Sequence, residues 1–212
     1  MKLWSAENRR YSQNGEDGVI AEVFDRLGIA EGTFLEFGAH PGENNTKALE
    51  ECGWHGFRYD AAPSGSGVLH AWVTPGNINQ FWPTTTDLNF LSIDIDGQDY
   101  WAWKAFHRMP VLVCIEYNAA FRYGEDRVVP YDPDFVWAKD DYFGASLSAL
   151  VKLGQRKGYR LLYCEASGTN AFFIREDAVK YFGPLPPPLQ LWKPPGYPRH
   201  PHSERWDDDG HS

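Results

Sequence analysis

Acidic and amide side chains stand at the ends of several short apolar runs in this 212-residue chain. They are Glu36, Asp60, Asp94, Asp96, Glu116 and Asn118. Oxygen atoms of this kind can bind Mg²⁺, Mn²⁺ or Ca²⁺, or accept two hydrogen bonds from a diol. Several carboxylates in one crevice repel each other unless something positive lies among them. If the runs are parallel strands, their carboxyl ends meet at one sheet edge, where ligands bind in open α/β folds.

The stretch that organises the chain is residues 33–46, TFLEFGAHPGENNT. TFLEF, between Gly32 and Gly38, predicts a buried strand, and KALEECGW after the turn predicts a helix. Glycine at positions 38 and 42 lets the backbone approach a ligand where a side chain would clash. Glu36 needs a partner in a buried strand, and an amine or hydroxyl of a bound cofactor would supply one. The alternative is a tight strand-to-helix turn with no ligand.

The spacing of this turn separates the candidate cofactors. Dinucleotide-binding turns read G-x-G-x-x-G and place a pyrophosphate at the helix start. Here the pattern is E-x-G-x-x-x-G, and Glu43 would repel a phosphate at the helix N-terminus. The pattern resembles the first motif of class I S-adenosylmethionine-dependent methyltransferases, in which the turn holds the methionine part of the cofactor. The cofactor contacts that we expect on this basis are Glu36, Gly38, Ala39, Gly42, Asn45, Thr46 and Asp94.

The second predicted strand, GFRYD, ends at Asp60, where nucleoside-binding folds hold the ribose hydroxyls. A helix cap or a solvated acid is the alternative reading of Asp60. Only AAPSGSG then precedes VLHAWVT, whereas a parallel crossover normally takes a dozen or more residues, usually with a helix. Either the crossover is pared down, or VLHAWVT is not a regular strand, or residues are missing. The next loop often borders the adenine in this fold, which makes Asn77 and Ile78 candidate contacts.

Two further predicted strands carry the remaining acids. One ends in SIDIDG, with Asp94 and Asp96, and is followed by the helix YWAWKAF; the next ends in IEYN, with Glu116 and Asn118. These positions resemble metal-dependent O-methyltransferases of the catechol type, in which a divalent ion such as Mg²⁺ chelates the substrate hydroxyls and lowers their pKa. The resemblance implies four metal ligands: Asp94, Asp96, Glu116 and Asn118. The catalytic candidates are Asp94, Asp96 and His40.

Each of these residues also has a structural alternative. Asp94 could cap the next helix, Asp96 and Asp99 could face solvent, and Glu116 could pair with Arg122 or Arg127. His40, in the glycine turn, could hydrogen-bond locally rather than act as a general base.

Residues 119–143 are polar and aromatic and lack a sustained period, which predicts an ordered active-site insertion. A surface flap packed on itself is the alternative. The candidate substrate contacts in and beside this segment are Tyr117, Tyr123, Tyr131, Trp137 and Tyr142. We expect a methyltransferase-like domain over residues 1–182 and a proline-rich tail over 183–212. The tail either wraps the domain through Leu189, Leu191 and Trp192 or extends from it, and its last residues, SERWDDDGHS, are expected to be disordered.

The predicted fold is α/β: a Rossmann-like, mostly parallel sheet with an antiparallel closing strand in three αβα layers. Asn14 or Asp17 could cap a first helix, GVIAEVFDRLGI, which Gly28 ends, and YRLLYCE with AFFIRED predicts the closing hairpin. SQNGED, LEFGAHPGENNT, SIDIDGQDYW, IEYN, GASL and GTNAFF together resemble the FkbM-like branch of these methyltransferases over residues 11–177. SQNGED has helix capping as an equal alternative to a functional role.

The amino-acid composition limits the classes of molecule that we expect this protein to bind. The net charge of −9 makes nucleic acid and anionic membranes poor partners. The chain has no apolar leader and no run that could span a bilayer. Its three cysteines lack metal spacing and lie in apolar settings, so we expect reduced core thiols and a cytoplasmic protein.

The resemblance implies S-adenosylmethionine-dependent methylation of a hydroxyl on a small molecule or sugar in a biosynthetic pathway, with a divalent metal as a further candidate. The expected partner is a small-molecule acceptor, and a homodimer is one option for assembly. Two alternatives stay open: an S-adenosylmethionine-binding enzyme of non-methyl chemistry, such as a cyclase or lyase, and a non-catalytic binding module on the same fold.

Overall fold

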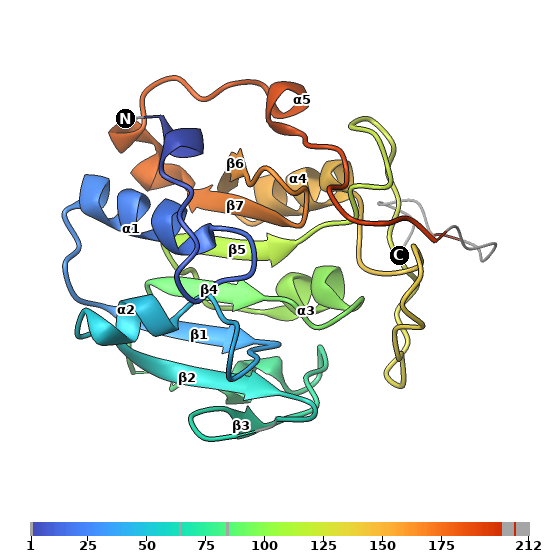
Figure 1. The fold of residues 1–212 in the computed structure, drawn as a ribbon, viewed down its shortest axis with the longest axis horizontal. Coiled ribbons are helices and arrows are strands. Elements are labelled where there is room, and N and C mark those ends of the chain that lie inside the picture. Colours follow the sequence, from blue (N-terminus) through green and yellow to red (C-terminus); the bar gives the residue numbers. More distant parts are fainter. Residues whose placement is uncertain (1, 64, 84, 201–205, 207–212) are drawn as a thin grey trace.

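The computed structural model describes residues 2–63, 65–83, 85–200 and 206. Its centre is one seven-stranded sheet (Figure 1). The strands are β1 (Thr33–Phe37), β2 (His55–Asp60), β3 (Leu69–His70), β4 (Phe90–Ile93), β5 (Leu112–Glu116), β6 (Tyr159–Cys164) and β7 (Asn170–Arg175). Their order is β3-β2-β1-β4-β5-β7-β6. β1 to β5 pair in parallel, and β7 runs antiparallel to both β5 and β6. The predicted fold class is therefore confirmed, including the antiparallel closing pair.

Helices cover both faces of this sheet (Figure 1). The α-helices are α1 (Glu16–Leu27), α2 (Lys47–Glu51), α3 (Asp99–Ala105), α4 (Leu147–Arg156) and α5 (Pro188–Leu191). The 3₁₀ helices are η1 (Leu3–Ser5), η2 (Ile78–Gln80) and η3 (Glu176–Tyr181). Alternate residues of each strand enter different cores, because successive side chains of a strand point to opposite faces. Phe34 and Phe90 pack under α1 and α2, whereas Leu35 and Leu91 pack with α3 and α4.

The first helix forms where the sequence predicts it, but its cap differs. Gly28 ends α1 in the left-handed conformation, with φ +68°. The N-cap is Gly15. Asp17, one of the two predicted caps, instead accepts the backbone amides of Arg10, Tyr11 and Ser12, so it shapes the loop before the helix. The other predicted cap, Asn14, donates its backbone N–H to Glu16 Oε2 at 2.8 Å. SQNGED therefore folds the entry loop against the sheet.

The short crossover after β2 is pared down. Residues 61–68 carry no helix in their described part, and VLHAWVT forms a strand only over Leu69–His70, paired in parallel with β2. Aromatic side chains cover the sheet face that a crossover helix would protect. Phe81 packs on Tyr59, and Trp82 packs edge-on against Phe57. The cover is partial, because Phe57 remains 42% exposed.

The C-terminal segment wraps the domain. Trp192 donates its indole N–H to the Phe121 carbonyl, and Leu191 packs with it against the core. Leu189, the third predicted contact, is 63% exposed instead. Most of SERWDDDGHS lies outside the described residues; Trp206, within it, packs against Phe121 and Tyr142. No helix in the described part of the chain has the length and apolar character that a membrane crossing requires.

Candidate functional site

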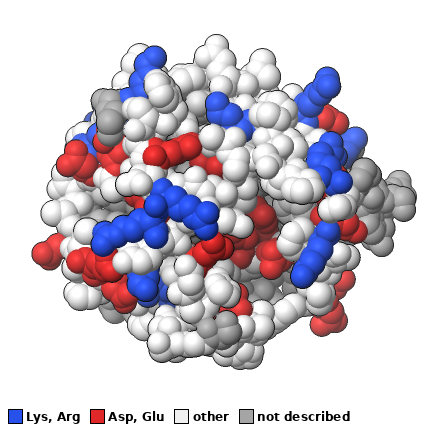
Figure 2. Space-filling model, viewed as in Figure 1, with Lys and Arg blue, Asp and Glu red and all other residues white. Residues whose placement is uncertain are grey.

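A cavity of about 760 Å³ opens at the carboxyl ends of the parallel strands. Five of the six predicted strand-end residues line it: Glu36, Asp60, Asp94, Asp96 and Glu116. Figure 2 shows acidic side chains gathered in the hollow near the middle of this face. Most residues of the segment 131–141, and the C-terminal segment around Tyr197, also line the cavity. The predicted convergence of acids on one crevice is thus present in the structure.

The glycine turn after β1 is built mainly by contacts within the protein. Gly38 has φ +84°, and a Cβ at this position would lie 1.4 Å from the Asp94 carbonyl oxygen. Its lack of a side chain therefore lets the ends of β1 and β4 meet. Gly42 has no such constraint, because an added Cβ would come no closer than 3.6 Å to the His40 ring. His40 lines the cavity, but its Nδ1 accepts the Gly42 amide at 3.2 Å, as the local alternative expected.

Glu36 already has partners within the chain. Its carboxylate accepts the Asn45 backbone amide at 2.7 Å and the Thr46 hydroxyl. Arg58 Nε donates to that hydroxyl at 2.7 Å and lies 4.0 Å from Glu36 Oε2. Burial raises the pKa of Glu36 to about 7 despite these bonds. Glu36 therefore has hydrogen-bond partners without a cofactor, and its side chain also borders the cavity.

The predicted nucleoside contacts divide into two groups. Asp60 lines the cavity and accepts the Ala62 amide at 2.6 Å through Oδ1. Asn77 instead braces its own loop, accepting the Thr74 amide and donating to the Trp72 carbonyl. Ile78 is fully buried in the core. Of the remaining predicted cofactor contacts, Gly38, Asn45 and Asp94 line the cavity, whereas Ala39, Gly42 and Thr46 are not among its lining residues.

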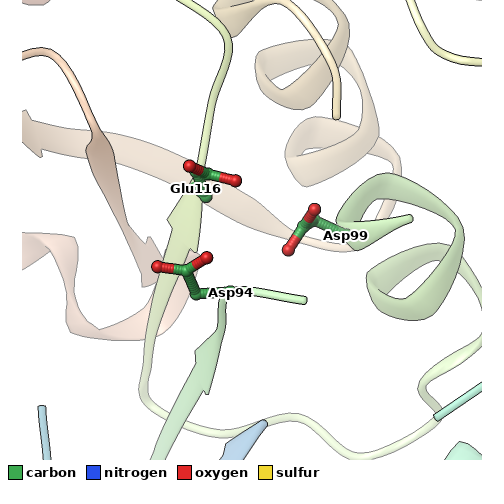
Figure 3. Close-up of side chains that lie close together, drawn as sticks. All are labelled: Asp94, Asp99 and Glu116. Atoms are coloured by element: carbon green, nitrogen blue, oxygen red, sulfur yellow. The ribbon is translucent and has the colours of Figure 1, made fainter. Parts of the chain in front are cut away.

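Three carboxylates meet at the edge of β4 and β5: Asp94, Asp99 and Glu116. An oxygen from each lies within 4.8 Å of an oxygen from the others (Figure 3). Asp99 is fully buried and accepts the amides of Ile95 at 2.8 Å and Gly97 at 3.0 Å. It therefore does not face solvent. Asp99, rather than Asp94, ties together the turn before α3.

Two of the four predicted metal ligands lie outside this group. Asp96 lines the cavity on a turn where its φ is +55°. Asn118 is fully buried and donates its amide to the carbonyls of Asp141 and Phe143, while its Oδ1 accepts the Ala120 amide. The predicted ligand set of Asp94, Asp96, Glu116 and Asn118 is therefore not brought together. An oxygen-only cluster still fits a hard divalent cation, with Asp99 in place of Asp96 and Asn118.

Burial and mutual repulsion raise the pKa values of these acids. Burial raises the pKa of Asp94 and Glu116 well above the ordinary range, and neighbouring carboxylates raise both further. Burial also raises the pKa of Asp99 to about 6. For Asp96, burial and then the charge of Asp60 raise the pKa. A cation bound among these residues would favour their ionised forms.

The predicted substrate contacts are only partly in place. Tyr131 and Trp137 line the cavity. Tyr117 is fully buried and donates its hydroxyl to the Lys193 carbonyl at 3.1 Å, so it anchors the C-terminal segment. Tyr123 packs against the core, and Tyr142 lies against Trp206. The central part of residues 119–143 therefore lines the cavity, whereas the two ends of this segment pack against other parts of the protein.

Two of the cavity residues that sequence reasoning missed, Asn170 and Tyr197, carry polar atoms that are unpaired among the described residues. Asn170 pairs directly with Glu116 across β5 and β7, and Tyr197 comes from the C-terminal segment. Asn170 is part of GTNAFF, one of the motifs that carried the family resemblance, so that motif could have indicated it. No motif or period marked Tyr197, because it lies in a proline-rich stretch.

Comparison with known protein families and with curated proteins finds no match to this chain.

Proposed function

We propose that this protein is an S-adenosylmethionine-dependent methyltransferase that acts on a hydroxyl of a small molecule or sugar. The observation that carries the proposal is the acidic cavity at the carboxyl ends of β1, β2, β4 and β5. The ionised forms of Glu36, Asp60 and Asp94 would repel a phosphate-bearing dinucleotide. A sulfonium cofactor is cationic at its reacting centre and suits the same lining. A volume of about 760 Å³ is within the range of small-molecule sites.

The residues of the cavity fit such a cofactor in part. Asp60 has one carboxylate oxygen engaged by the Ala62 amide, and carboxylates have capacity to accept further hydrogen bonds from a ribose diol. Asp94 lies next to the glycine turn, where the methionine part is expected, and Asp96 lines the same cavity. When bound, the cofactor would supply an electrophilic methyl group. The chain would hold the acceptor oxygen in line with that group and exclude water.

The acids at the cavity floor provide a proton acceptor for this chemistry. Asp94 and Glu116 have raised pKa values, which brings them closer to the range in which a carboxylate acts as a general base near neutral pH. A divalent cation held by Asp94, Asp99 and Glu116 would offer another route, because it lowers the pKa of a bound hydroxyl. Asp96 lines the cavity outside this carboxylate cluster.

Calorimetric titration with S-adenosylhomocysteine tests the cofactor assignment. We expect saturable one-site binding, and no heat at high protein concentration would reject both methylation and other S-adenosylmethionine chemistry. If binding is observed, mass analysis of candidate products separates methylation from cyclisation or lysis. Binding without any turnover would favour the non-catalytic module. Unchanged activity and thermal stability in EDTA would remove the metal from the proposal.

We also propose a cytoplasmic location. The described cysteines are all free thiols, with Cys114 and Cys164 buried in the core. Cys52 is exposed, which corrects the expectation that all three lie in apolar settings. An exposed unpaired thiol is typical of a reducing compartment.

A further inference from the structure

Three residues of the cavity end in buried polar atoms that have no hydrogen-bond partner in the described part of the chain. They are Glu116 Oε2, Asn170 Oδ1 and Tyr197 Oη. Buried polar atoms in folded proteins are nearly always paired. These three come from β5, β7 and the C-terminal segment, so no local turn explains why all of them are unpaired. Their common feature is the cavity, and a ligand is the natural partner.

The three side chains are neighbours. Glu116 and Asn170 are directly opposed in the antiparallel pair of β5 and β7, which places their side chains on the same face. Asn170 is 3% exposed, and its Nδ2 donates to Glu16 Oε1 at 2.8 Å. That bond fixes the amide, because only the nitrogen can donate to a carboxylate. Tyr197 lines the same cavity as Glu116 and packs against Phe143. Burial and then the charge of Glu116 raise the pKa of Tyr197, and the nearby Ala119 backbone amide lowers it.

The chemistry of these atoms selects the ligand. All three can accept a hydrogen bond, and a cation bound beside Glu116, Asp94 and Asp99 would favour the ionised forms of these acids. A primary ammonium group carries three N–H donors and one positive charge, so its donors match the three acceptor atoms in number and its charge suits the carboxylate. A hydroxyl donates only one hydrogen bond, and an anion would be repelled. The aromatic ring of Tyr197 adds a surface that favours a cation.

The position of these atoms separates them from the predicted nucleoside contact. β5 and β7 are the third and fourth strands from β2 in the sheet order. With about 4.8 Å between neighbouring strands, they lie roughly 14 and 19 Å from the strand that carries Asp60. A ribose held at Asp60 therefore leaves this end of the cavity to a second ligand.

We propose that Glu116, Asn170 and Tyr197 form an ammonium-binding subsite for the methyl acceptor, and that the acceptor is an amine-bearing small molecule. The identification of the ligand as a methyl acceptor rests on the proposed function, whereas the ammonium subsite itself does not. In this arrangement the amine anchors the acceptor, and a hydroxyl elsewhere on the molecule is methylated. The C-terminal segment, which supplies Tyr197, is then part of the acceptor site.

Calorimetric titration of the full chain with 1,4-diaminobutane, 1,4-butanediol and MgCl₂ tests the subsite, with and without saturating S-adenosylhomocysteine. We expect the diamine to bind at least about tenfold more tightly than the diol, because only the diamine offers charge and three donors. Glu116→Gln should weaken diamine binding by about tenfold or more, and Tyr197→Phe by about threefold to tenfold. The matched controls are Glu43→Gln, a cavity-rim acid at the β1 end, and Tyr181→Phe, an exposed tyrosine of η3. Both controls should bind as the wild type does, and thermal unfolding checks that all four variants fold.

Several outcomes would overturn the proposal. Equal binding of diol and diamine, or no binding of the diamine, would leave only water or a neutral group at these atoms. Tight Mg²⁺ binding that displaces the diamine and is insensitive to Tyr197→Phe would indicate a metal site. Loss of S-adenosylhomocysteine binding in both Glu116→Gln and Tyr197→Phe would assign the subsite to the ammonium of the cofactor. If the wild type binds the diamine as expected but not S-adenosylhomocysteine, the ammonium subsite stands and the proposed function fails.

Discussion

Glu116, the last residue of β5, lies directly opposite Asn170, the first residue of β7, at the point where the sheet changes from parallel to antiparallel. The carboxyl ends of parallel strands always meet at one edge. An antiparallel neighbour instead brings its amino end to that edge. The reversal therefore places the start of β7 beside the acids of β4 and β5, and it adds an amide to an otherwise acidic floor.

Gly38 is expected to be essential for folding. In Gly38→Ala, the new Cβ would lie 1.4 Å from the Asp94 carbonyl oxygen, and the φ of +84° would be strained. We expect a loss of about 3 kcal/mol or more in the free energy of unfolding, or failure to fold. Chemical denaturation measures this, with Gly42→Ala as the control, because that site has room for a methyl group. A stable Gly38→Ala protein would contradict the close approach of β1 and β4.

Asp60 is expected to contribute to cofactor affinity without being needed for the fold. Asp60→Asn keeps a carbonyl oxygen for the Ala62 amide but removes the charge that strengthens hydrogen bonds to a diol. We expect S-adenosylhomocysteine to bind about tenfold more weakly, with unchanged thermal stability. Asp134→Asn, on the insertion and outside the lining of the cavity, serves as the control in the same titration. Equal affinities of the two variants would place the ribose elsewhere.

Stability is expected to fall as the pH rises from about 5.5 to 8 in EDTA. Burial raises the pKa of Glu36 to about 7 and that of Asp99 to about 6, and it raises that of Asp94 as well. The folded state therefore holds protons that the unfolded chain releases above about pH 4, and this stabilisation is lost as the pH rises through the folded-state values. Urea denaturation at several pH values measures the slope.

The same experiment on Asp94→Asn isolates one of the acids. An amide does not titrate, so the decline in unfolding free energy between pH 5.5 and 8 should be shallower than in the wild type. Glu43→Gln, at an exposed acid paired with Arg9, serves as the matched carboxylate-to-amide control. A wild-type stability that rises with pH over this range would show that the acids are not desolvated as the structure has them.

Asp141 is expected to hold the C-terminal segment against the domain. Its carboxylate accepts the His200 amide at 3.0 Å and pairs with Arg199 at 3.0 Å. Asp141→Ala removes both contacts, so trypsin should cleave after Arg199 several times faster, while the core stays folded. Mass spectrometry of a limited digest follows the cleavage, with Asp134→Ala as the control. Equal cleavage rates would mean that Trp192 and the Tyr117 hydroxyl suffice to fix the segment.

The sequence was most informative where an apolar run predicted a strand and the geometry of parallel sheets then placed the end of that strand. The apolar runs of β1, β4 and β5 predicted their strands, and parallel pairing then placed Glu36, Asp94 and Glu116 at one edge. The roles of these acids were harder to predict. Glu36 is satisfied by Asn45 and Thr46 only ten or fewer residues further on, because the turn folds back over the strand.

The rest of the site depends on contacts that no local pattern records. Asn118 was expected to bind a metal, but residues 119–143 fold back over it. Its side-chain amide donates to the carbonyls of Asp141 and Phe143 instead. For Asp99, solvent exposure was an alternative reading of the sequence, but the turn after β4 closes around its carboxylate. Tyr197 reaches the cavity only because a distant segment wraps the domain. These are long-range packing outcomes, and spacing along the chain does not determine them.

Because the crossover after β2 is short, the corner of the sheet formed by β2 and β3 is only thinly covered by other parts of the chain. Rings of Phe81 and Trp82 stand where other sheets of this kind carry a helix, and β3 contributes only Leu69 and His70. Backbone amides in that corner have the least cooperative protection, so deuterium should enter there sooner than in β4 or β5. Asp60 stands in the same corner. Binding of a molecule at Asp60 should therefore slow deuterium uptake in β2 and β3. This measurement needs no turnover, and it concerns a part of the sheet far from the ammonium subsite.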